Sequence, residues 1–351
     1  MKEFIGCDAH KKYSVFVRMN EAGQYSRAVR VPHDLEGYRR YLATLPPGSG
    51  IGLETTANWY WMVDEMERAQ HRPRLGDASL ARARMGHRSK DHTLDGRGLA
   101  QLLRMGTFPD VWIPSAEVRD QRELIRLRLW LVRQRTRVKN RTQAILCNYG
   151  VLVQGVSDVF GMEGREAIEQ GGVQLPDHTR QSVQQQLELL DTLNAHIDAV
   201  EQCTEKTLGE TTETKLLQTA PGIGRILAPA ILLHMGNVDR FATARHFSSY
   251  IGLVRRVESS GGHRWQGPKR QDANHYLKWA FTEAANCVVL NKSLAGSQVV
   301  QLYERVYGKT GCYGKAVTAV ARHLAEAVWH MLKKGEPYRA PNFRAVPSTP
   351  R

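Results

Sequence analysis

The sequence has few cysteines, no long apolar run and fewer acidic than basic residues. Its five cysteines are odd in number and widely scattered, which argues against a disulfide framework and against a zinc site. No stretch approaches the roughly 18 to 20 apolar residues needed to span a bilayer. The first residues lack an apolar signal region followed by a small-residue cleavage site. We therefore expect a cytosolic protein with no membrane partner.

Basic residues are in clear excess. Lys and Arg number 49 against 35 Asp and Glu, which gives a formal net charge of +14. A charge of this size predicts attraction to a polyanion, and nucleic acid is the leading partner. The chain has 351 residues, more than one hydrophobic core usually serves, so two or three domains are expected.

The first part of the chain alternates between strand and helix patterns. Three strands are predicted at 4–8, 14–18 and 26–31. The elements predicted after them are a helix at 34–45, a strand at 50–54, a helix at 56–70, a strand at 74–76 and a helix at 94–105. An antiparallel meander followed by alternating helices and strands is the order of an RNase-H-like α/β domain, which we place at residues 1–115.

The pattern then changes to long helices. A helix is predicted over 116–150, with an apolar seam at the seven-residue intervals of a coiled coil: Leu124, Leu131, Val138 and Ile145, with Leu127 between the first two. Residues 151–178 predict a loop-dominated insertion, and 179–207 a second amphipathic helix. Whether it pairs with the first helix or with another subunit stays open. We place a helical coiled-coil linker at 116–207.

Cations crowd residues 122–141 of the first of these long helices, where Glu123 is the only acidic residue. So many like charges would repel one another unless a polyanion lies alongside. We expect nucleic acid to contact this helix, although a solvated helix face is the alternative. The residues we expect to make that contact are Arg126, Arg133, Arg137 and Arg141.

Four carboxylates stand where a metal site could form. Asp8 and Glu54 each end a predicted strand, and Asp91 and Asp95 lie four apart at the entry to a helix. Gathered carboxylates repel unless a divalent cation neutralises them, and Mg²⁺ prefers such ligands. Two ions can activate an attacking oxygen and stabilise a leaving one in phosphoryl transfer. Singly, each residue could equally be a turn or cap residue.

The remainder of the chain is predicted to be mainly helical, with a domain at 208–340 and a tail at 341–351. Ala220 to Gly224 is similar to the hairpin of a helix-hairpin-helix module, in which Gly222 and Gly224 would let backbone N–H groups approach a phosphate. An ordinary turn between two helices is an equally good interpretation.

A serine pair follows among cations. Ser259 and Ser260 precede two glycines, and a hydroxyl in such a loop can act as a nucleophile. From composition alone a flexible turn is the commoner interpretation. The neighbouring cations that we expect to contact nucleic acid are Arg255, Arg256, Arg264 and Lys269.

Taken in order, these motifs resemble a known family along nearly the whole chain. The matching segments are Gly6 to Lys11, Leu53 to Thr56, Lys90 to Ala100, Pro221 to Gly224, Arg240–Phe241, Tyr250 to Leu253, Ser260–Gly261, Gly267, Asn274 to Lys278, Ala319 to Arg322 and Gly335 to Tyr338. In this order they resemble the DEDD transposases of insertion-sequence family one-ten.

The resemblance implies a RuvC-like N-terminal domain, a coiled-coil linker and a C-terminal transposase domain. It implies that Asp8, Glu54, Asp91 and Asp95 bind Mg²⁺ and that Ser260 forms a transient phosphoserine link to DNA. It also implies a noncoding guide RNA that pairs with donor and target DNA, so that the protein holds backbones. A homo-oligomer, dimer or tetramer, is expected.

The sequence departs from the family pattern in two places. The last aspartate pair is commonly three apart, whereas here it is four, with His92 in the alternative position. Ala273 stands for a glycine and Lys278 for an arginine. Ser259 beside Ser260 leaves the choice of nucleophile open, although Ser260 matches the motif through its neighbour Gly261. Two other functions stay in view: a structure-selective nuclease without a covalent intermediate, and a non-catalytic nucleic-acid-binding protein.

Overall fold

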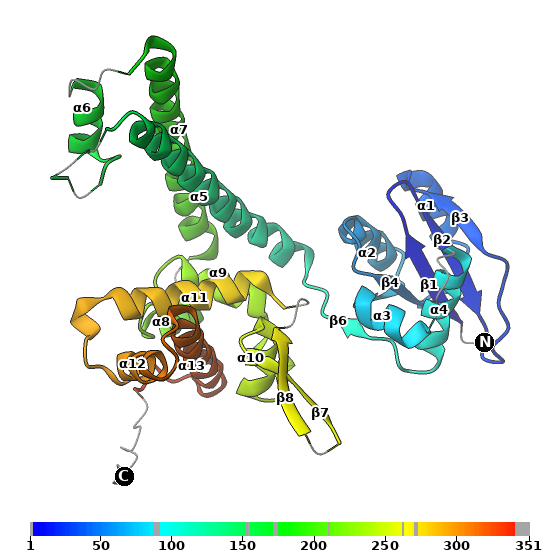
Figure 1. Ribbon diagram of the computed structural model, residues 1–351. Helices are drawn as coiled ribbons and strands as arrows, with labels where there is room; N and C mark the ends of the chain where they lie inside the picture. The colour runs from blue at the N-terminus through cyan, green and yellow to red at the C-terminus, as the bar shows by residue number, and fades with distance from the viewer. Residues whose placement is uncertain are drawn as a thin grey trace, which may run out of the picture. The chain divides into compact units, whose positions relative to one another are not determined.

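In the computed structural model of the chain, the described residues are 3–86, 92–151, 153, 155–156, 158–170, 175–209, 211–261, 263–269 and 273–340. The chain divides into two compact units, Met1–Glu117 and Val118–Arg351. Figure 1 colours the first unit from blue to cyan and the second from green to red. Among the helices of the described residues, none combines the length and apolar character needed to cross a bilayer.

A six-stranded mixed sheet forms the centre of the first unit. The strand order is β3-β2-β1-β4-β5-β6, with β1–β2, β2–β3 and β5–β6 antiparallel and β1–β4 and β4–β5 parallel. The strands are β1 (Phe4–Ala9), β2 (Tyr13–Met19), β3 (Val29–Pro32), β4 (Gly50–Glu54), β5 (Arg72–Gly76) and β6 (Asp110–Val111). The predicted mixed α/β domain with an antiparallel meander is confirmed.

Helices cover both faces of this sheet. Alternate residues of β1 and β4, such as Ile5, Cys7 and Leu53, join one apolar cluster with Tyr38 and Met62. The other face carries a second cluster around Leu99 and Phe108. The helices are α1 (Leu35–Leu42) and α2 (Trp59–Arg68) on the first face, and α3 (Ala78–Met85) and α4 (His92–Arg104) on the second. Neither α3 nor β6 was predicted.

Two long antiparallel helices, α5 (Ala116–Asn148) and α7 (Asp177–Leu208), pack together in the second unit (Figure 1). Leu131, Val138 and Ile145 contact apolar residues of α7, as the predicted seam requires, whereas Leu127 is 40% exposed. Polar contacts between the two helices recur every seven or eight residues: Arg128–Glu201, Arg135–Asn194, Thr142–Gln186 and Tyr149–Thr179. This spacing is that of a heptad repeat.

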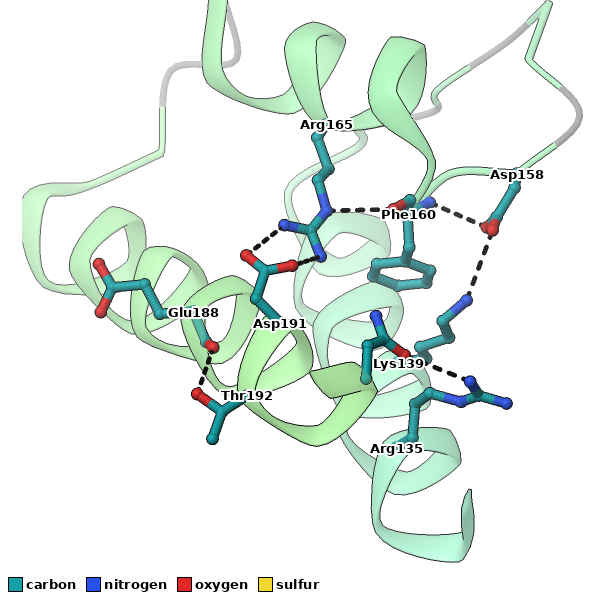
Figure 2. Close-up of polar contacts among 9 residues, drawn as sticks. Arg135, Lys139, Asp158, Phe160, Arg165, Glu188, Asp191 and Thr192 are labelled. Atoms are coloured by element: carbon teal, nitrogen blue, oxygen red, sulfur yellow. Dashed lines mark hydrogen bonds and ion pairs between the residues drawn. The ribbon is translucent and has the colours of Figure 1, made fainter. Parts of the chain in front are cut away.

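The insertion between these helices is more ordered than the loop-dominated segment that was predicted. It contains α6 (Met162–Gln170), whose Ile168 packs against Leu187 and Leu190 of α7. Figure 2 shows how α6 and the preceding loop are held: Arg165 donates to Asp191 at 2.7 Å and to the Phe160 carbonyl at 3.1 Å. The poor apolar periodicity of this stretch hid a helix that is held by the packing of Ile168 and by the polar contacts of Arg165.

The rest of the second unit is mainly helical, as predicted, around a core that includes Phe247, Phe281 and Leu324. α5 is attached to it because Ile125 and Leu129 pack on Ala230 and Leu233. Its elements are α8 (Thr212–Gln218), α9 (Leu227–Met235), η1 (Val238–Arg240), α10 (Ala244–Ile251), β7 (Arg255–Ser260), β8 (His263–Lys269), α11 (His275–Leu290), η2 (Lys292–Leu294), α12 (Gln298–Thr310) and α13 (Tyr313–Lys334). The hairpin β7–β8 was not predicted.

Candidate active site

Asp8 and Glu54 lie side by side at the carboxyl ends of two neighbouring strands. β1 and β4 are parallel, and their register pairs Cys7 with Leu53, one residue before each carboxylate. Side chains alternate between the faces of a sheet, so Asp8 shares its face with Gly6 and Glu54 shares its face with Gly52. Both carboxylates therefore lie on the face that α4 covers.

Two glycines bring α4 close enough to add a third carboxylate. A Cβ atom on Gly6 would lie 2.0 Å from the carbonyl oxygen of Gly96 and 2.8 Å from the amide of Ala100, so only glycine permits this contact. The helix backbone thus rests directly on β1. Asp95 occupies the first turn of α4, immediately before Gly96.

The charges of these residues act on one another. Burial, and after it the negative charges of Asp8 and Asp95, together raise the pKa of Glu54 from its ordinary value to about 7. Asp77 contributes in the same direction, whereas the guanidinium of Arg82 opposes the shift. The three predicted carboxylates Asp8, Glu54 and Asp95 therefore share one electrostatic environment.

Three residues near these carboxylates were not predicted. His10 places its Nε2 2.9 Å from the Asp8 carboxylate, and its ring lies 4.7 Å from that of Tyr13. Asp77 follows β5 and caps α3 by accepting a hydrogen bond from the Leu80 amide, and Arg82 lies on α3. Asp77 and Arg82 could have been found from the sequence, because an aspartate directly after a predicted strand is a typical helix N-cap and predicts the start of α3.

These carboxylates fit a hard divalent cation by the chemistry of their oxygens and by the repulsion that such an ion would relieve. Among the residues that the structure describes, however, no three His, Cys, Asp or Glu side chains converge on one point. Asp91 lies outside the described residues, and His92 opens α4. The described acidic residues thus interact electrostatically without forming a complete set of metal ligands.

Ser260 is the last residue of β7, at the tip of a strand hairpin. It pairs with His263 of β8, and Gly261 between them has a φ of +57°. From composition alone, a flexible turn was the commoner interpretation of this serine pair. In the structure both serines belong to the end of a paired strand, since Ser259 pairs with Arg264. The cations expected to contact nucleic acid, Arg255, Arg256, Arg264 and Lys269, all belong to the same two strands.

The two hairpin glycines lie in different surroundings. Gly222 has a φ of +78°, and a Cβ there would lie 2.2 Å from the Ala284 carbonyl oxygen of α11. The close approach of α11 therefore explains why this position is a glycine. Gly224 is exposed, and no atom of the described residues lies within 4 Å of the corresponding position. A phosphate contact at this turn stays a prediction.

The cations of α5 are also placed differently from one another. Arg126 is half-buried, with its guanidinium 5.5 Å from the centre of the Tyr276 ring. Arg133, Arg137 and Arg141 are exposed. Buried Arg122 donates two hydrogen bonds to the Leu233 carbonyl near the end of α9, at 3.0 and 2.8 Å. Part of the basic character of α5 therefore attaches the helix to its own unit.

Two transposase family models match most of the chain. One is described as "Transposase IS116/IS110/IS902 family" and matches residues 214–301. The other is a model of IS110 DEDD transposases, described as "Transposase", and matches residues 5–150. The second match contains all four predicted carboxylates, and the first contains Ser260.

Curated relatives of similar length agree. The chain is 24% identical to "Probable family 20 transposase" of Pseudomonas aeruginosa over 86% of this chain and 88% of the relative. It is 23% identical to "Transposase for insertion sequence element IS1111A" of Coxiella burnetii over 72% and 69%, and 24% identical to "Transposase for insertion sequence element IS1328" of Yersinia enterocolitica over 64% and 65%. The chain therefore belongs to the IS110 family of DEDD-type DNA transposases.

Proposed function

We propose that this transposase excises and inserts its own mobile DNA element by Mg²⁺-dependent strand cleavage and exchange, through a phosphoserine link at Ser260. The observation that carries the proposal is the placement of Asp8 and Glu54 at the ends of two neighbouring parallel strands, under the helix that carries Asp95. The charges of Asp8 and Asp95 help to raise the pKa of Glu54, and a bound cation would relieve this repulsion. The bound Mg²⁺ would be held by these three residues and Asp91, and would neutralise charge on a reacting phosphate.

Ser260 would supply the nucleophile. Its hydroxyl oxygen forms the new bond to phosphorus, and the deoxyribose oxygen of the broken strand leaves. The phosphoserine ester retains the energy of the phosphodiester, so the hydroxyl of a second strand can displace the serine. The cations of β7 and β8 would hold the phosphate during both steps.

The choice of DNA sequence would be made by a noncoding guide RNA that pairs with donor and target DNA, as the family resemblance implies. The protein would then bind nucleic-acid backbones through Arg126, Arg133, Arg137, Arg141 and the open turn at Gly224. We further propose that α5 and α7 form a coiled coil and that the active form is a homo-oligomer, a dimer or tetramer.

A plasmid recombination assay tests this function. The plasmid carries the element with its noncoding ends, and excision and insertion are scored by PCR across both junctions. We expect Ser260→Ala and Asp8→Asn each to abolish both products, while the matched control Ser259→Ala retains them. Undiminished recombination by Ser260→Ala would refute the serine mechanism.

The carboxylate cluster by itself also fits a nuclease that cleaves with metal-activated water. Asp8, Glu54 and Asp95 all belong to the first unit, and Ser260 belongs to the second. A nuclease of this kind would lose activity in Asp8→Asn and keep it in Ser260→Ala. The same pair of variants therefore separates the two functions.

A further inference from the structure

The cations of α5 that follow Arg126 fall into two sets. Those that face α7 or the insertion have partners: Arg128 donates to Glu201 at 2.7 Å, Arg135 to Asn194 at 3.2 Å and Lys139 to Asp158 at 3.5 Å. Figure 2 shows the side chains of Arg135 and Lys139. The second set is exposed and forms no ion pair within the described part of the chain: Arg133, Arg137 and Arg141. The second set carries unbalanced positive charge.

An exposed indole continues this second set along the helix. Trp130 is 55% exposed, although its neighbours Leu129 and Leu131 are buried. Steps of three or four residues separate Trp130, Arg133, Arg137 and Arg141, so all four side chains share one face of α5. We call these four residues the Trp–Arg stripe. No acidic residue occurs in the sequence between Glu123 and Asp158.

We propose that the Trp–Arg stripe binds a single-stranded segment of nucleic acid, with a base stacked on Trp130 and phosphates held by the three arginines. The proposal rests on the proposed function only in taking nucleic acid as the partner. A duplex covers the faces of its bases by stacking, so Trp130 would meet only base edges and sugar-phosphate. An unpaired base offers the indole an aromatic face while its backbone meets the guanidinium groups.

A second copy of the chain fits this surface less well. Two stripes placed face to face would bring one set of unpaired arginines against another, and the repulsion would oppose the small gain from covering two indoles. The same arginines attract a polyphosphate strand. Charge complementarity therefore favours nucleic acid over self-association as the occupant of the stripe.

The length of the stripe sets the expected footprint. Trp130 and Arg141 are eleven residues apart, which corresponds to about 16 Å of helix at about 1.5 Å per residue. A stacked strand advances about 3.4 Å per nucleotide, so the stripe spans about five nucleotides. Neutralising three phosphates of a single strand predicts a contribution of about 2 to the slope of log K against log salt.

Binding of labelled 12-nucleotide probes to the full-length protein tests the proposal. The probes are single-stranded DNA, single-stranded RNA of the same sequence and the matching DNA duplex, each without self-complementarity. We expect Trp130→Ala to weaken single-strand binding by about 5- to 150-fold, the range of base–aromatic stacking, and to leave duplex binding unchanged. The DNA and RNA probes show which strand the stripe prefers.

Matched variants separate stacking from apolar packing and from bulk charge. Trp130→Phe keeps a ring and should retain most of the affinity, whereas Trp130→Leu keeps apolar bulk and should behave like Trp130→Ala. Replacing Arg133, Arg137 and Arg141 with Gln should lower the salt slope by about 2. The same change at the exposed Lys206, Lys292 and Lys309 removes equal charge and should leave the slope unchanged.

Two results would overturn the proposal. Equal single-strand affinity in wild type, Trp130→Ala and the arginine triple variant would exclude the stripe as a binding site. A change of oligomeric state in Trp130→Ala, seen by light scattering without loss of single-strand affinity, would assign the stripe to a second copy. Neither result bears on Ser260, because the recombination assay of Ser260→Ala tests the proposed function separately.

Discussion

Gly6→Ala should separate α4 from the sheet and disturb the carboxylate cluster. The new Cβ would lie 2.0 Å from the Gly96 carbonyl oxygen and 2.8 Å from the Ala100 amide, whereas weak C···O contacts lie at about 3.3 to 3.6 Å. α4 must therefore move by more than about 1 Å. Overpacking of this kind costs about 1 to 3 kcal/mol, and the upper end applies because the colliding atoms are helix backbone.

Hydrogen exchange measured by mass spectrometry on the full-length protein provides the assay. A loss of about 3 kcal/mol corresponds to roughly 150-fold faster exchange in peptides from β1 and α4, where opening limits exchange. Gly50→Ala is the matched control, because no atom of the described residues lies within 4 Å of a Cβ at that position of β4. Its effect should stay within about 0.5 kcal/mol. Equal exchange in the two variants would refute the close approach of α4 to β1.

Two further predictions concern pH and the glycine turn. The raised pKa of Glu54, about 7, means that the folded protein holds a proton that the unfolded chain has released above its ordinary carboxyl pKa. Without divalent ions, stability should therefore fall as pH rises from about 4.5 to about 7. In Glu54→Gln, the melting temperature should depend less on pH over this range. An unaltered pH dependence in this variant would contradict the raised pKa of Glu54. Gly222→Ala should destabilise the second unit by about 2 kcal/mol or more in denaturant titrations, because its Cβ meets the Ala284 carbonyl at a positive φ, while Gly224→Ala should melt like wild type. Equal melting of the two turn variants would argue against the Gly222 contact.

The sequence was most informative where a periodic pattern also decides three-dimensional position. Strand patterns at 4–8 and 50–54 located β1 and β4, and strand ends on one sheet can face each other. The structure then shows that these two strands are parallel neighbours, with Asp8 and Glu54 near the same edge. The seven-residue spacing of Leu131, Val138 and Ile145 likewise identified the face of α5 that α7 covers. In each case the period of the backbone fixes which side chains share a face.

Contacts between distant residues could not be predicted in this way. Gly6 and Gly222 are glycines because α4 and the Ala284 carbonyl approach them, and no local pattern indicates either neighbour. The β7–β8 hairpin was missed because its strands are largely polar and lack an apolar alternation. The Gly261–Gly262 pair between them was the available hairpin signal. The proposed base-stacking role of Trp130 could not be predicted either, because it depends on the exposure of the indole in the structure.

The most direct test of the mechanism is to trap the covalent link between protein and DNA. A suicide substrate, nicked so that the cleaved strand dissociates, is incubated with the full-length protein, Mg²⁺ and the element's RNA, and the adduct is digested and sequenced by mass spectrometry. We predict a phosphodiester adduct on Ser260 that is absent in Ser260→Ala, in Asp8→Asn and in the presence of EDTA. Cleavage of the substrate by Ser260→Ala, or an adduct on another residue, would contradict the account.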